Sequence, residues 1–100
     1  MIVHSVYFWL RDGLSEEEKG RFYKGLLELK NIPSVVDLYV GIPAKTQKRQ
    51  ILDDSYTYAV VVIFQDIAGH DSYQVHPVHQ EFLRNFSSYW ERVIVYDIEA

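Results

Sequence analysis

The segment Tyr73-Gln-Val-His-Pro-Val-His79 gathers the residues of this chain that are best suited to move a proton. His76 and His79 are three positions apart, which places both side chains near one helix face, with Tyr73 in the preceding turn. A histidine with a pKa of about 6.5 can accept a proton at neutral pH. A tyrosine hydroxyl can donate a hydrogen bond to a carbonyl oxygen as negative charge grows on it. Together these groups suit proton abstraction beside a carbonyl.

A structural role is the alternative for the same residues. In this interpretation His76 bonds a backbone carbonyl at a helix break, His79 is a partly buried core residue, and Tyr73 packs on a sheet. Buried histidines are often structural, so the residues alone leave both interpretations open.

The two histidines also have the spacing of a metal-binding pair. Zinc or iron would need further ligands, and the candidates His4, His70 and Glu81 form no recognisable pattern in the sequence. We therefore expect neither a metal nor a cofactor. Glycine-rich phosphate loops and nucleophile elbows are absent as well.

Composition narrows the class of protein. A chain of 100 residues predicts one domain over residues 1–100, and 15% aromatic residues leave apolar surface that we expect to close against a ligand or another subunit. The lack of cysteine excludes a disulfide scaffold and thiol catalysis. A net charge of −4 argues against nucleic-acid binding. The one basic cluster, Lys45, Lys48 and Arg49, could meet an anionic substrate group or form a solvated loop.

The first apolar run is too short for a membrane span and carries His4 and Ser5. It also lacks the basic start and the small-residue cleavage site of a signal peptide. We therefore expect a cytoplasmic protein with no membrane partner.

Four segments rich in β-branched and aromatic residues predict strands, at residues 2–10, 35–40, 56–64 and 92–98. Ser15 and Glu18 form a capping-box pattern that starts a helix ending at Asn31-Ile32-Pro33. Asp66 caps a short helix through Tyr73, and Pro77 suits the first turn of another. The order predicts an α+β, ferredoxin-like βαββαβ fold, with helices on one face of a four-stranded antiparallel sheet.

The strand at residues 2–10 is apolar on both faces, and the run at residues 56–64 has no polar face, so it should be central in the sheet. Helices can cover only one face. We therefore expect a homodimer in which two sheets close into an α/β barrel.

His4 shares a strand face with Val6 and Phe8, so it either points toward the helices and His79 or is a satisfied core histidine. Between sheet and helices we expect a site for a small hydrophobic or carbonyl-containing ligand. Its expected lining residues are His4, His76, Tyr23, Leu26, Val60, Val62, Phe82 and Trp90.

Four segments together resemble the stress-responsive α/β barrel (Dabb) family: Val-His-Ser-Val-Tyr-Phe-Trp-Leu, Tyr-Thr-Tyr-Ala-Val-Val-Val, Tyr-Gln-Val-His-Pro-Val-His and Tyr-Trp-Glu-Arg-Val-Ile-Val-Tyr-Asp. The resemblance covers nearly the whole chain and implies a dimeric ferredoxin-like barrel. Most members of the family have no established activity. A plant polyketide cyclase among them closes its substrate by aldol condensation without metal or cofactor, which implies His79 as general base and Tyr73 as the group that steadies the carbonyl oxygen.

Two positions depart from the cyclase pattern, because Leu26 stands for a tyrosine and Leu83 for a glycine. This implies a smaller and less polar cavity than a polyketide needs. Three functions follow as hypotheses. The first is a cofactor-independent acid–base enzyme of the cyclase, isomerase or lyase type acting on a small carbonyl compound. The second is a non-catalytic ligand-binding or stress-response protein, and the third is a cofactor-free monooxygenase.

Overall fold

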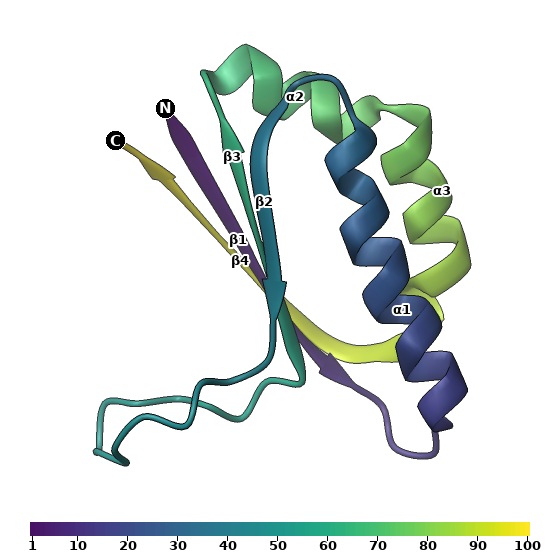
Figure 1. Ribbon diagram of the computed structural model, residues 1–100, viewed down its shortest axis with the longest axis vertical. Coiled ribbons are helices and arrows are strands. Elements are labelled where there is room, and N and C mark those ends of the chain that lie inside the picture. Colours follow the sequence, from purple (N-terminus) through teal and green to yellow (C-terminus); the bar gives the residue numbers. More distant parts are fainter.

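The computed structural model describes all 100 residues and contains one antiparallel sheet with the strand order β2-β3-β1-β4. The strands are β1 (Ile2–Leu10), β2 (Val35–Gly41), β3 (Tyr58–Phe64) and β4 (Trp90–Glu99). Figure 1 shows all three helices on one side of the sheet, whereas the loop of residues 42–57 extends away from the helix layer. The predicted ferredoxin-like arrangement, with residues 58–64 in a central strand, is confirmed.

The helices are α1 (Glu16–Glu28), α2 (Ile67–Val75) and α3 (Pro77–Phe86), with short 3₁₀ turns at Leu29–Asn31 and Ser87–Tyr89. The capping box of α1 forms as predicted: Glu18 N donates to Ser15 Oγ at 3.0 Å, and Ser15 N donates to Glu18 Oε1 at 2.9 Å. Asp66 caps α2 by accepting a hydrogen bond from the backbone of Gly69. No helix combines the length and the apolar character that crossing a membrane requires.

Two strands begin at other residues than predicted, and β2 and β4 each end one residue later than predicted. β3 begins at Tyr58 rather than at residue 56, because the Thr57 hydroxyl, not a backbone carbonyl, accepts the hydrogen bond from Leu10 N at 3.0 Å. A side-chain partner at that position ends the regular ladder. β4 begins two residues earlier than predicted, since Trp90 pairs with Leu10 across a register shift.

The core lies between the sheet and the helices. Alternate residues of β1 and β3 point into it, and Phe22 and Leu26 of α1 meet them with no exposed surface. The helices also approach each other closely, because a Cβ added to Gly25 would lie 2.6 Å from the Phe86 ring. On the opposite face of the sheet Tyr7 packs against Tyr96, which stays 60% exposed. The helix-covered face therefore carries the core, and the other face carries apolar side chains without cover in the single chain.

Candidate functional site

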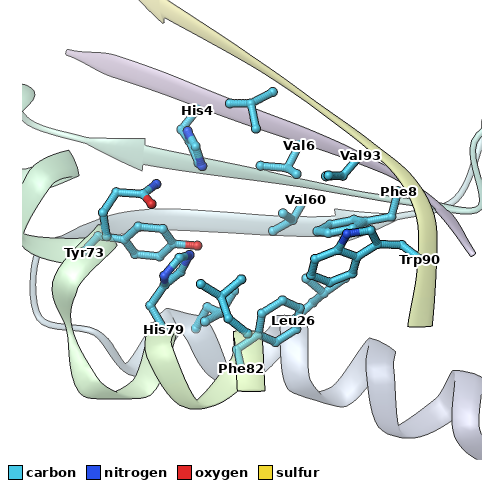
Figure 2. A pocket seen from close by; sticks show the side chains of 14 residues that line it. His4, Val6, Phe8, Leu26, Val60, Tyr73, His79, Phe82, Trp90 and Val93 are labelled. Atoms are coloured by element: carbon cyan, nitrogen blue, oxygen red, sulfur yellow. The ribbon is translucent and has the colours of Figure 1, made fainter. Parts of the chain in front are cut away.

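A cavity of about 220 Å³ lies between the sheet and the helices, and 11 of its 14 lining residues are hydrophobic. Figure 2 shows how its two ends differ: His4, Tyr73 and His79 gather at one end, whereas aromatic side chains such as Phe8 and Trp90 form the other. The site is thus an apolar chamber with a polar end, the usual form of a small-molecule site.

A helix break brings Tyr73 and His79 together. Tyr73 lies near the end of α2 and His79 in the first turn of α3. Between them, His76 ends one helix and caps the next: the Val78 backbone N–H donates to His76 Nδ1 at 3.1 Å, and Pro77 occupies the first helical position. The chain therefore turns at this point, and the ring centroids of Tyr73 and His79 come to lie 4.7 Å apart.

The surroundings of His79 favour the neutral form of its imidazole. Burial lowers the pKa of its imidazole below 6.5, and the charges of His4 and His70 lower it further. A polar interaction with the Gln74 backbone acts in the opposite direction and raises the pKa. Its Nδ1 is buried and has no hydrogen-bond partner. Because Nδ1 has almost no accessible surface, a ligand in the cavity can reach the imidazole only through its other nitrogen, Nε2.

The surroundings of Tyr73 favour the protonated form of its phenol. Its side chain is only 2% exposed, and burial raises the pKa of the phenol above 10. Figure 2 shows its hydroxyl pointing into the cavity beside His79. The phenol therefore stays protonated at neutral pH and can donate a hydrogen bond to an oxygen atom in the cavity.

His4 lies opposite Asp97 in the register of β1 and β4, and its Nδ1 is 2.5 Å from Asp97 Oδ1. Burial lowers the pKa of His4, although the hydrogen bond and the charge of Asp97 oppose the shift. The His4 ring lies 5.9 Å from that of Tyr73. The sequence analysis did not name Asp97 as a site residue. Strand alternation placed it on the same face as Val93 and Val95, but the register between β1 and β4, which sets it opposite His4, cannot be read from the sequence.

Several expected lining residues do line the cavity: His4, Leu26, Val60, Phe82 and Trp90. The sequence analysis did not name others among its lining residues, namely Val6, Phe8, Leu29, Gln74, Leu83, Val93 and Val95. The alternation that points His4 inward also applies to Val6 and Phe8, so that signal was present in the sequence.

Three expected lining residues lie outside the cavity. His76 serves as a helix cap, and its partner is a backbone N–H rather than the carbonyl of the structural alternative. The side chain of Tyr23 on α1 is 37% exposed, and its ring packs against that of Tyr58 with the centroids 5.8 Å apart. Val62 is fully buried in the core but does not reach the cavity.

The basic residues Lys45, Lys48 and Arg49 all lie in the loop of residues 42–57, and none of them lines the cavity. Lys48 pairs with Asp54, and Arg49 donates to the backbone oxygen of Gln47 at 3.0 Å. These contacts stay within the loop, as expected of a solvated segment rather than a binding site for an anionic substrate.

Comparison with known proteins gives a consistent family match. A family model described as the stress responsive A/B barrel domain matches residues 2–100. The chain is also 31% identical over 97 residues to olivetolic acid cyclase from Cannabis sativa, and the match covers 96% of this chain and 93% of the cyclase.

Solved structures share the fold. A hydroxynitrile lyase from Passiflora edulis matches with a TM-score of 0.82 at 20% identity, over 97% of this chain and 90% of the lyase. A dimeric ferredoxin-like protein of unknown function from Thermobifida fusca matches with a TM-score of 0.80 at 20% identity, over 99% of this chain and 90% of that protein. At 20% identity, both structural similarities show that the fold is shared and nothing more.

Proposed function

This chain belongs to the stress-responsive α/β barrel (Dabb) family, and we propose that it is a homodimeric acid–base catalyst that removes a proton beside the carbonyl of a small apolar compound. The observation that carries the proposal is the pair at the polar end of the cavity. There, the imidazole of His79 and the phenol of Tyr73 both line the cavity, with their ring centroids 4.7 Å apart.

In this mechanism His79 is the general base. Its lowered pKa keeps the imidazole neutral at neutral pH, so it can take a proton from the carbon next to the carbonyl. Tyr73 donates a hydrogen bond to the carbonyl oxygen and stabilises the enolate that forms. The apolar walls exclude water, which strengthens both interactions. The base and the donor supply these steps without a cofactor.

The cavity supports a small substrate. A volume of about 220 Å³ lies below the range of about 300–1,000 Å³ common for ligand pockets, and Leu26 and Leu83 fill part of the wall. The similarity to olivetolic acid cyclase supports chemistry at a carbonyl compound, with cyclisation as the favoured outcome. Isomerisation and cleavage of a carbon–carbon bond need the same base and donor, so they stay within the proposal.

A second copy of the chain would cover the open face of the sheet. Tyr7, Trp9 and Tyr96 lie there, with Tyr56 in contact with the first two. Aromatic side chains on an uncovered sheet face are unusual in a monomer and common at subunit interfaces. The dimeric relative with the same fold also supports this assembly.

A proton-exchange experiment separates a catalyst from a ligand-binding protein. Small methyl ketones are incubated with the protein in D₂O and followed by NMR. A catalyst accelerates deuterium incorporation at the carbon next to the carbonyl. A protein that only binds shifts or broadens the ketone signals without accelerating exchange, and that result would refute the proposal.

A further inference from the structure

Three elements bring three potential metal ligands together beside the cavity. His4 lies on β1, His70 on α2 and Asp97 on β4, and one ligand atom from each lies within 4.8 Å of the others. We propose that His4, His70 and Asp97 form a binding site for a divalent transition-metal ion of the zinc class. The sequence did not indicate this grouping, because the three residues are far apart along the chain and form no metal-binding motif.

The donor set selects the class of ion. Two imidazole nitrogens with one carboxylate suit zinc and its neighbours in the first transition row, whereas magnesium and calcium prefer sites built from oxygen atoms. Three protein ligands leave at least one coordination position for water.

The distances need only a small rearrangement. His4 Nδ1 lies 2.5 Å from Asp97 Oδ1, and His70 Nε2 lies 4.0 Å from Asp97 Oδ2. Ligand atoms around a tetrahedral zinc ion are about 3.3 Å apart, as bond lengths of about 2.0–2.2 Å require. The Asp97 carboxylate must therefore move away from His4 and toward His70. Its side chain is 47% exposed on an edge strand, which leaves it room to rotate.

The surroundings of His70 favour the tautomer that can bind. Asp71 Oδ1 lies 3.0 Å from His70 Nδ1, so the carboxylate holds the ring proton on that nitrogen. The lone pair of Nε2 then accepts a long hydrogen bond of 3.4 Å from the Gln74 amide, which a metal ion would replace. A carboxylate behind a histidine ligand is the recurrent arrangement in zinc sites, where it orients the ring and raises its basicity.

A second hollow, which shares no lining residue with the cavity, reaches two of the three ligands. The hollow has a volume of about 320 Å³, and its lining residues are His70, Asp71, Asp97, Glu99 and three isoleucines, Ile2, Ile67 and Ile98. An ion can therefore reach His70 and Asp97 without passing through the cavity, whereas His4 lines the cavity itself. Neither His79 nor Tyr73 is a ligand, so the inference does not depend on the proposed function.

Zinc binding is tested on the untagged full chain by titration calorimetry with ZnCl₂, together with visible absorption on adding CoCl₂. We expect one zinc ion per chain and a cobalt spectrum with nitrogen ligation. His70→Gln, which removes the ligand and keeps a similar size, should weaken binding at least 100-fold. Asp71→Asn should weaken it by about 10- to 100-fold, as loss of a carboxylate behind a ligand typically does.

His76→Asn is the matched control, because it removes a histidine outside the cluster and leaves a residue that can cap the helix. It should bind zinc as tightly as the wild type, and MgCl₂ should give no binding. Circular dichroism checks that each variant is folded. The proposal is overturned if the folded wild type binds no zinc at micromolar concentration, if His70→Gln binds as tightly as the wild type, or if magnesium binds equally well.

Discussion

Tyr73 and His79 lie on different helices, yet their ring centroids are 4.7 Å apart and their planes are inclined by 52°. The cause is local, because α2 ends and α3 begins at His76-Pro77. The chain changes direction there, and the side chains of Tyr73 and His79 come to face each other. The geometry of the proposed acid–base pair therefore depends on a helix cap that does not itself line the cavity.

The first prediction concerns that cap. His76→Ala removes the acceptor for the Val78 backbone N–H and should cost about 1 kcal/mol of folding free energy, as loss of an N-cap typically does. In a chain of 100 residues this corresponds to a fall in Tm of about 4–8 °C, which differential scanning calorimetry measures. His76→Asn restores a side-chain acceptor and should recover most of the loss. Equal destabilisation in both variants would contradict the capping role.

The second prediction concerns pH and is made with a chelator present, so that no metal ion contributes. Because burial lowers the pKa of His79, kcat/KM for proton exchange should rise with pH through a midpoint below 6.5. The raised pKa of Tyr73 should then keep the profile flat up to pH 10. The other ionisable groups near the pair are His4, His70 and Asp97. A midpoint above 6.5, or a decline between pH 8 and 10, would contradict these assignments.

Stability should follow the same ionisation with a defined sign. In the unfolded chain His79 binds its proton near pH 6.5, whereas in the folded chain it does so only at lower pH. The unfolded state therefore binds more protons in that window, and the free energy of unfolding falls as pH drops below 6.5. Urea denaturation should show a smaller fall for His79→Gln than for the wild type. An equal fall in both would place the ionisation elsewhere.

The third prediction compares two glycines of α1. A Cβ at Gly25 would lie 2.6 Å from the Phe86 ring, whereas a Cβ at Gly20 meets nothing within 4 Å. Gly20→Ala should raise stability by up to about 1 kcal/mol through helix propensity. Gly25→Ala gains the same propensity but forces a ring packed against Phe82 to move, which typically costs about 1–3 kcal/mol. Opposite shifts in Tm are expected; two equal increases would mean that the α1–α3 contact is loose.

The fourth prediction tests the dimer. Tyr96→Lys places a charge on the open face of the sheet and should shift the protein to monomer in light scattering coupled to size exclusion. Leu27→Lys is the control, since Leu27 is 44% exposed on α1, in the helix layer on the other side of the sheet. It should leave the dimer intact. A wild-type monomer at micromolar concentration, or dissociation by Leu27→Lys alone, would contradict the proposed interface.

Local signals in the sequence predicted the elements well. β-Branched runs located the strands, and Ser15 with Glu18 located the start of α1, because these signals act over a few residues. The partner of His4 escaped prediction because the β1–β4 register joins residues 93 positions apart. His70 was named only as a possible further ligand for His76 and His79. Its place beside His4 could not be predicted, because it depends on the packing of α2 against the sheet, which brings the two ring centroids to 5.1 Å.

The most direct measurement is the rate of deuterium incorporation into a small methyl ketone by the wild type, His79→Gln, Tyr73→Phe and His76→Asn. With His79 as base, His79→Gln should lose the accelerated exchange while its dimer and far-ultraviolet circular dichroism persist. Tyr73→Phe should lose about 10²–10³-fold, as removal of one oxyanion donor does. His76→Asn should exchange like the wild type, because asparagine can still cap α3 and this position does not line the cavity. Accelerated exchange that survives in folded His79→Gln would contradict the proposed role of this histidine.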